Sequence, residues 1–185
     1  MRASQINMSS LKVLKTFTIG KGQTMDIIED KSAAEDSIDR YFSEATFTGE
    51  ELFKVPPHWH KKHDEYIRVM EGRAKITLDG KEIIVKAGDP PVLIARRVVH
   101  SIETFEGERA VIQERPSPGG IYKAMFFNDM FCKGPSPGFW YLMRAFYDGD
   151  GYIALPLYFR FFDVLFITVF GGIAHLFTAP RPQSL

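Results

Sequence analysis

The fold of this chain is decided by one stretch, Pro56-Pro57-His58-Trp59-His60-Lys61-Lys62-His63-Asp64-Glu65. A run that alternates like a β-strand follows it and ends at Gly72. Side chains two positions apart in an extended strand point to the same face, so His58 and His60 project together. Glu65 can join them once the chain has turned back at Lys61-Lys62. Two neutral imidazoles and one carboxylate form a ligand set for a divalent transition metal that leaves coordination positions open.

From His58 onward, the spacing H-x-H-x4-E-x6-G matches the first signature of the cupin superfamily, which this chain therefore resembles. The glycine that usually leads that signature is missing. The family's second signature, G-x5-P-x-G-x2-H-x3-N, is degenerate here, because only Gly88 and His100 match it and the histidine comes one residue late. Ile94 replaces its proline and Arg96 replaces its second glycine, so the chain before His100 must turn by other means.

The resemblance implies a double-stranded β-helix, or cupin jelly-roll barrel, with His58, His60, Glu65 and His100 around one metal inside it. The metal would be one divalent transition ion, with Fe(II) first and Zn, Mn or Ni as alternatives. Glu65 is also the predicted catalytic residue, since its charge sets the charge at the metal. The alternative to metal occupancy is a metal-free barrel that keeps the shape of the site for binding a sugar or an anion.

In overall appearance, including an aromatic-rich tail, the chain resembles small single-barrel cupins of fungal polyketide gene clusters. That resemblance predicts a metal-dependent oxidoreductase of the dioxygenase type, acting on a small aromatic or polyketide-like secondary metabolite. A non-redox, metal-assisted isomerase or cyclase is the second predicted function. A cupin that binds a small molecule without catalysis is the third. A single carboxylate leaves net positive charge on the metal, which favours an anionic oxygen ligand such as a phenolate or enolate.

Three further residues are candidates for binding the substrate. His63 is out of phase with the ligand face and lies in a polar turn, so we expect an exposed side chain, with a proton shuttle at the pocket mouth as the alternative. Arg96 belongs to a loop that is either solvated or a clamp for a carboxylate or phenolate, since a guanidinium can bind a carboxylate bidentately. Gln113 can hydrogen-bond a substrate if its strand turns it toward the barrel interior.

The chain is predicted to be mainly β up to about residue 116. Strand-like segments are expected at 13–19, 24–28, 40–48, 66–70, 92–95, 98–105 and 109–115. Asp79-Gly80 joins two more β-rich runs as a type I′ hairpin turn, because glycine tolerates a positive φ. Short strands with turns roughly every eight to twelve residues are typical of an antiparallel barrel or sandwich. Residues 1–116 therefore form the predicted cupin β-barrel with its N-terminal strands.

After residue 116 the sequence becomes rich in aromatic residues, and residues 117–185 are predicted to form a helical extension packed on the barrel or on a partner subunit. Helices are expected at 121–131, 139–147 and 157–177. The last segment contains only Arg160 and Asp163 as charges, and their spacing suits a pair on one exposed helix face. At about 20 residues per crossing it is long enough to span a bilayer. Membrane association through 157–177 is thus the alternative to packing on the barrel or in a homodimer.

Composition adds expectations about partners and location. With 23 basic and 23 acidic residues the chain has no net charge, and no DNA-reading motif is visible, so we expect a small-molecule substrate and no nucleic acid. The single cysteine, Cys132, excludes an intramolecular disulfide and favours a reducing compartment. No secretory signal is recognised between Met1 and Gly20. We therefore expect a cytoplasmic protein, which is peripherally membrane-associated if the tail binds lipid.

Overall fold

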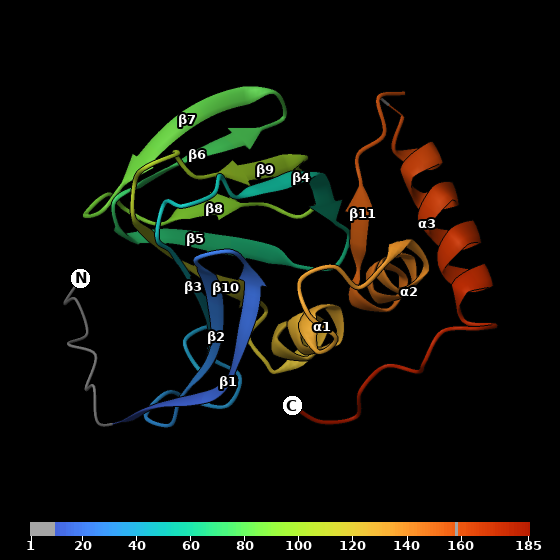
Figure 1. Cartoon of the computed structure of the whole chain (residues 1–185), viewed down its shortest axis with the longest axis horizontal. Helices are drawn as coiled ribbons and strands as arrows, with labels where there is room; N and C mark the ends of the chain where they lie inside the picture. Colours follow the sequence, from blue (N-terminus) through green and yellow to red (C-terminus); the bar gives the residue numbers. More distant parts are fainter. Residues whose placement is uncertain (1–9, 158) are drawn as a thin grey trace.

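Two antiparallel β-sheets dominate the computed structural model, which describes residues 10–157 and 159–185 (Figure 1). The first sheet has the order β1 (Leu11–Gly20), β2 (Gln23–Asp30), β3 (Tyr41–Phe47), β10 (Ala110–Ser117), β5 (Asp64–Glu71) and β8 (Val92–Ile94). The second has the order β11 (Gly151–Ile153), β4 (Lys54–His60), β9 (His100–Glu103), β6 (Arg73–Leu78) and β7 (Lys81–Lys86). The predicted mainly-β cupin architecture is confirmed. Residues 1–9 of the predicted barrel and residue 158 of the predicted last helix lie outside the described residues.

The core lies between the sheets and is built by alternation along the strands, since successive side chains point to opposite faces. Ile67 and Val69 of β5 and Ile76 of β6 are almost completely buried in one apolar cluster. Phe126 and Phe127 add to this cluster from helix α1 (Tyr122–Phe131). α1 therefore packs directly on the barrel, as Figure 1 shows, and can reach into it with its polar side chains.

Two tight turns fix the strands around the histidine stretch. The β6–β7 hairpin has positive φ angles of 45° at Asp79 and 83° at Gly80, as the predicted type I′ turn requires. Gly72, which ends the H-x-H-x4-E-x6-G spacing, has a φ of 70°. A Cβ atom at this position would lie 2.1 Å from the carbonyl oxygen of Arg109, so only glycine lets β5 and the start of β10 approach this closely.

Three helices form the tail, namely α1, α2 (Phe139–Gly149) and α3 (Arg160–Ala174). The first two agree with the predicted segments, but the predicted helix 157–177 is too long. Phe159 has an extended backbone with φ of −115° and ψ of 113°, so α3 begins only at Arg160. Among the described residues, no helix has both the length and the apolar character needed to cross a bilayer.

A short strand that the sequence pattern did not reveal joins the tail to the histidine strand. β11 pairs with β4 so that Tyr152 lies opposite Trp59, and their rings stack with centroids 4.4 Å apart. Trp59 stands between His58 and His60 in sequence and therefore points to the opposite face of β4. The same strand thus offers its histidines to the barrel interior and its tryptophan to the tail.

The two charges of α3 do not form the predicted pair on an exposed face. The side chain of Asp163 is buried and accepts hydrogen bonds from Trp59 Nε1 at 2.9 Å and from the backbone N–H of Leu155 at 2.8 Å. Arg160 lies instead 3.7 Å from Asp79 of the barrel. A buried carboxylate needs hydrogen-bond donors, and Trp59 supplies one that helical spacing could not predict. Both charges therefore attach α3 to the barrel.

Candidate metal centre

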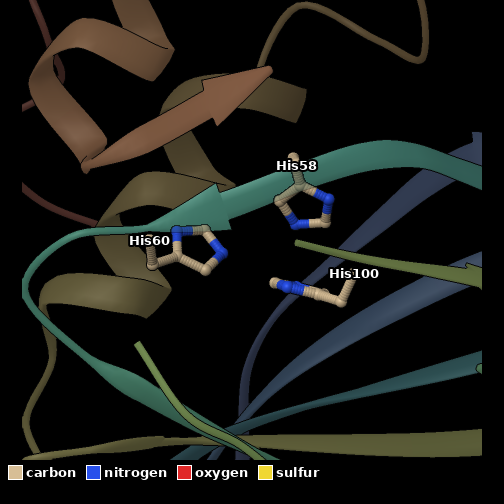
Figure 2. A group of neighbouring side chains, drawn as sticks. All are labelled: His58, His60 and His100. Atoms are coloured by element: carbon tan, nitrogen blue, oxygen red, sulfur yellow. The ribbon is translucent and has the colours of Figure 1, made fainter. Parts of the chain in front are cut away.

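The four predicted ligands are brought together from the two sheets. His58 and His60 of β4 and His100 of β9 project into the space between the sheets, and their ligating atoms lie within 4.8 Å of one another (Figure 2). β4 and β9 pair so that His58 lies directly opposite His100. Glu65 reaches the same point from β5 of the other sheet. Its Oε1 atom lies 3.0 Å from Nε2 of His60, and its Oε2 atom lies 3.1 Å from Nε2 of His100.

The backbone orients all three imidazole rings. Each ring has its Nδ1 atom close to one carbonyl oxygen: His58 to Pro56 at 2.9 Å, His60 to Asp150 at 2.9 Å and His100 to Val98 at 3.1 Å. A carbonyl oxygen only accepts hydrogen bonds, so each Nδ1 must carry the proton. The neutral rings then present the lone pair of Nε2 to the cluster. This is the tautomer of a metal-bound histidine, with a second hydrogen bond that fixes the ring.

The surroundings of the Nε2 atoms suit a bound cation. Within the described part of the chain, the buried Nε2 atoms of His60 and His100 have no hydrogen-bond partner, although Glu65 is close to both. Lone pairs and an ionised carboxylate repel one another unless a cation lies among them. Donor atoms about 2.1 Å from one ion and at right angles to each other stand about 3 Å apart, which agrees with the observed spacing. The residues present therefore fit one divalent ion.

Burial keeps two of the rings neutral. It holds the pKa of His58 well below its usual value, and the adjacent imidazoles of His100 and His60 act in the same direction. Burial also lowers the pKa of His60 to about 4, assisted by the positive charge of Lys123. Neutral imidazole is the form that binds a metal, so these environments favour ligation at neutral pH.

The turn before His100 explains the degenerate second signature. Arg97, not Arg96, has the left-handed backbone, with a φ of 69°. Its N–H donates a 2.7 Å hydrogen bond to the carbonyl oxygen of His60, which holds the turn against the histidine strand. From Arg97 to His100 the spacing is that of G-x2-H. The late histidine therefore reflects one extra residue upstream of the turn, while the turn itself keeps the family spacing.

Two charged residues that sequence reasoning missed complete the cluster. Lys123 of α1 is buried and donates a 2.5 Å hydrogen bond from Nζ to Oε1 of Glu65. The same ammonium lies 3.1 Å from Oε1 of Glu114 on β10. Glu114 has the strand parity of the core residue Ile112, which the sequence could have revealed. Lys123 is the one basic residue of α1, but nothing local indicates that α1 covers the barrel at this point.

The charges of these residues are strongly coupled. Burial would raise the pKa of Glu65, but Lys123, His60 and His100 together outweigh it and hold that pKa well below its usual range. Burial likewise opposes the charge on Lys123, whose pKa is nevertheless raised by Glu114 and Glu65. Burial, followed by the charge of Glu65, raises the pKa of Glu114 to about 7. One ammonium is thus shared between an ionised carboxylate and a carboxyl group that is partly protonated near neutrality.

The expectation that His63 is an exposed turn residue is wrong, because only 3% of it is accessible. Its Nδ1 atom lies 3.2 Å from Oδ2 of Asp150, which follows α2, and its Nε2 atom lies 3.5 Å from Glu65. The Asp150 carboxylate also accepts hydrogen bonds from the N–H groups of Lys61 and Lys62, so the tail folds over the turn. Burial disfavours charge on His63, but the hydrogen bonds to Asp150 and Glu65 outweigh it and raise its pKa.

Arg96 lies outside the cluster and is about half exposed. Its guanidinium binds the carboxylate of Asp64 with two hydrogen bonds of 3.0 Å, and its backbone N–H donates to the same carboxylate. The planar donor fork that was expected to clamp a substrate carboxylate is therefore already occupied by the protein's own carboxylate. The pair ties the loop before β9 to the start of β5.

Gln113 is buried, but it is not brought to the cluster. Its side-chain nitrogen donates a 2.6 Å hydrogen bond to Glu44, and its oxygen accepts a 2.7 Å hydrogen bond from Arg115. Alternation along β10 sends Gln113 to the face opposite Glu114 and the core. On this strand it is Glu114, and not Gln113, whose side chain points toward the barrel interior.

A pocket of about 300 Å³ lies on the outer side of His63. The barrel, the α1 region, the end of α2 and the C-terminal segment all contribute to its wall, which includes Lys62, His63, Tyr122, Asp148, Asp150 and Arg181. His63 therefore separates this pocket from Glu65. The pocket thus adjoins the cluster through His63, while none of the four predicted ligands is part of its wall.

The family model for the cupin domain matches residues 49–112. The chain is similar to the structure of KdgF from Halomonas sp., with 19% identity and a TM-score of 0.45 over 64% of this chain and 94% of that chain. It is also similar to an RmlC-like cupin from Shewanella frigidimarina, with 17% identity and a TM-score of 0.43 over 57% of this chain and 84% of that chain. The capsular polysaccharide assembling protein CapF from Staphylococcus aureus shares 16% identity, with a TM-score of 0.45 over 57% of this chain and 30% of that chain. Among curated proteins, none matches the chain.

Proposed function

This chain belongs to the cupin superfamily through its residues 49–112, and on that premise we propose that it is a metal-dependent enzyme acting on a small organic anion. His58, His60, Glu65 and His100 are the proposed ligands. The proposed reaction is that of an oxidoreductase of the dioxygenase type, with Fe(II) as the first choice of metal and an aromatic or polyketide-like molecule as substrate. All four ligands lie on strands of the barrel.

One observation carries the metal assignment. The carbonyl oxygens of Pro56, Asp150 and Val98 each hold one Nδ1 atom, so that three Nε2 lone pairs converge near Glu65. A protein that used these histidines only for hydrogen bonding would pair the buried Nε2 atoms with donors. No such donor is present among the residues that the structure describes, whereas a divalent ion would satisfy every lone pair at once.

Bound there, a divalent ion would polarise a carbonyl or enolate oxygen, and as Fe(II) it would supply reactivity toward dioxygen. The three neutral imidazoles add no charge, so the site keeps a positive excess that attracts an anionic oxygen of the substrate. Lys123 adds to that excess while it holds Oε1 of Glu65 in place. The apolar barrel core excludes bulk water from the ligands, which strengthens all of these electrostatic interactions.

A second function, non-redox isomerisation or cyclisation, is favoured by His63. This ring stands between the pocket and Glu65, with Asp150 on its Nδ1 side. A histidine held by a carboxylate on one nitrogen can accept a proton from a substrate carbon or hydroxyl group at the other, or return it. Here His63 Nε2 lies 3.3 Å from Nζ of Lys123, so the ammonium can donate a hydrogen bond to the neutral ring and hold it in place.

The metal assignment is tested by the metal content of protein purified without a metal-binding tag, followed by titration of the stripped protein with Co(II). We expect one ion per chain. His58→Ala and His100→Ala should each weaken Co(II) binding by more than about 100-fold, since even the loss of a ligand's supporting partner costs about 10–100-fold. His175→Ala removes an exposed imidazole of the tail and serves as the matched control. Unchanged binding in both site variants would refute the assignment.

The choice between the two reaction classes requires one comparison. The Fe(II)-loaded and Zn-loaded proteins are incubated with a panel of aromatic and polyketide-like hydroxy acids, in air and under strict anaerobiosis. The oxygenase proposal predicts product only with Fe(II) and only with consumption of dioxygen. Product formed anaerobically with either metal would support the isomerase or cyclase instead, and product formed by the metal-stripped protein would exclude both.

A further inference from the structure

Two carboxylates and two cationic side chains line the pocket beside His63. They differ in their partners, because each carboxylate already contacts other groups of the chain. Asp148 lies 3.0 Å from Arg144, which it shares with Asp129, and 3.1 Å from His175. Asp150 binds His63 at 3.2 Å and two backbone N–H groups. Both carboxylates are therefore held in place by contacts within the chain and are not free to pair with Lys62 or Arg181.

The cationic half has no such partners. Over residues 10–157 and 159–185, neither Lys62 nor Arg181 forms an ion pair. Arg181 uses one Nη2 contact of 3.4 Å to the carbonyl oxygen of Tyr122, which orients the guanidinium and leaves its other donors available. Lys62 approaches from the β4–β5 turn and Arg181 from the segment after α3, so the two charges enter the pocket from opposite parts of the chain.

We infer that this pocket is an anion subsite in which Lys62 and Arg181 bind a carboxylate of the substrate. The inference rests on the proposed function and adds the class of substrate. Arginine suits this role because its planar fork pairs with a carboxylate through two hydrogen bonds. The ring of Tyr122 supplies an adjoining wall for a flat substrate, and its hydroxyl is already donated to Pro118.

The size of the pocket limits the substrate further. Ligand pockets have volumes of about 300–1,000 Å³, so 300 Å³ is at the lower end of that range. It accommodates a molecule with one ring and a few substituents. With its carboxylate between the two cations, such a molecule also contacts His63, which lines the same pocket. The substrate class is therefore a monocyclic carboxylic acid, such as a hydroxybenzoic acid.

The test uses benzoate and its neutral isostere benzamide as probes of the metal-stripped full-length chain, so that chelation of a metal plays no part. Binding is measured by saturation-transfer NMR and by titration of amide chemical shifts. We expect benzoate to bind at least about tenfold more tightly than benzamide, as hydrogen bonds to charged groups predict. Lys62→Gln and Arg181→Gln should each lower benzoate affinity about five- to tenfold and leave benzamide unchanged.

Lys61→Gln is the matched control, because Lys61 is the adjacent turn residue and is not part of the pocket wall. Its benzoate affinity should equal that of the wild type. Absence of benzoate binding, equal binding of the two probes, or the same loss in Lys61→Gln as in Lys62→Gln would overturn the subsite. Co(II) titration of the same samples separates the two proposals, since a failed subsite leaves metal binding intact and a failed metal site leaves benzoate binding intact.

Discussion

Lys123 and Glu65, which lie 58 positions apart, bring an ammonium nitrogen and a carboxylate oxygen to 2.5 Å inside the barrel. Glu65 is also a proposed metal ligand, so two cations would share one carboxylate. Like charges this close repel strongly in a buried site. Lys123 therefore stabilises the metal-free protein and weakens metal binding at the same time.

Replacement of Lys123 by methionine tests this competition. Methionine keeps the length of the side chain and removes its charge. We expect Co(II) to bind at least about tenfold more tightly, because the repulsion is removed and Glu65 is free for the metal. The metal-free variant should lose about 3 kcal/mol of stability, since Glu65 is left without its buried counter-ion. Both quantities come from Co(II) titration and from urea unfolding with and without metal.

Lys15→Met is the control for that experiment. Lys15 also contacts α1, through a 2.8 Å hydrogen bond to Asn128, but lies away from the metal ligands. Its Co(II) affinity should remain that of the wild type. A Lys123→Met protein that folds normally and binds Co(II) no more tightly than the wild type would contradict the competition.

Glu65→Gln tests the carboxylate itself. The exchange removes one charge and changes little volume. We expect Co(II) affinity to fall at least about 100-fold and metal-dependent activity to fall with it. Glu103→Gln is the matched control. Glu103 lies on β9, binds Lys75 at 2.7 Å and has no part in the cluster. Equal Co(II) affinities of the two variants would remove Glu65 from the ligand set.

Asp163→Ala tests the attachment of the tail. It deprives Trp59 Nε1 and the Leu155 N–H of their common acceptor, and the two orphaned donors should cost about 2–4 kcal/mol of unfolding free energy. The fluorescence of Trp59 should shift to the red as water reaches the ring. Arg160→Gln breaks a partly exposed 3.7 Å ion pair and removes the guanidinium 5.2 Å from the Trp59 ring, and it should change stability by less than about 2 kcal/mol. Similar losses in the two variants would contradict the assignment.

We propose that the outer face of α3 pairs with a second copy of the chain. Seven large apolar side chains on or just after this helix are exposed: Phe161, Phe162, Leu165, Val169, Ile173, Leu176 and Phe177. Together they offer several hundred Å² of apolar surface, close to the roughly 800 Å² that one partner contributes to a standard interface. Helices that lie on membranes carry basic residues on their polar side. The two charges of α3 are used on its own barrel, which favours the protein partner.

Light scattering of the purified chain measures this association. We expect a mass of twice 21.1 kDa at micromolar concentration, and Phe161→Lys should restore the single-chain mass because a buried charge opposes pairing. Leu93→Lys places the same charge at a similarly exposed site on β8 and should leave the mass unchanged. A wild-type mass of 21.1 kDa would exclude the dimer. Co-sedimentation of that monomer with phospholipid vesicles would assign the face to a membrane.

The β-strands and the approach of His58, His60 and Glu65 were predictable because both depend on local spacing. Alternation fixes which side chains share a face, and the Asp79-Gly80 pair fixes a hairpin through its backbone angles. His100 was predicted from the family resemblance instead, although it lies one residue late in the second signature. In the structure, Arg97 makes the turn before His100 with a left-handed backbone. The sequence does not reveal this, because the position lacks the glycine that usually marks such a turn.

The rest of the cluster depends on contacts between distant segments. Lys123 and Asp150 have no local pattern that marks them as site residues, and they arrive because α1 packs on the barrel and β11 pairs with β4. His63 was expected to be exposed for the same reason, since its cover comes from the tail. For Asp163 the local pattern was misleading. Its helical spacing to Arg160 predicted a pair between these two charges, but the carboxylate accepts a hydrogen bond from Trp59 instead.

His60 takes its tautomer from the carbonyl oxygen of Asp150, a residue added to the growing polypeptide 90 positions later. The ten strands from β1 to β10 therefore do not by themselves fix which nitrogen of this ring carries the proton. His63 depends on the same residue, since its carboxylate partner is the Asp150 side chain. A chain that ends before α2 would keep every strand of the barrel up to β10 and lack the contacts that orient His60 and His63. Loss of the tail would thus weaken the proposed metal site without removing any of its ligands.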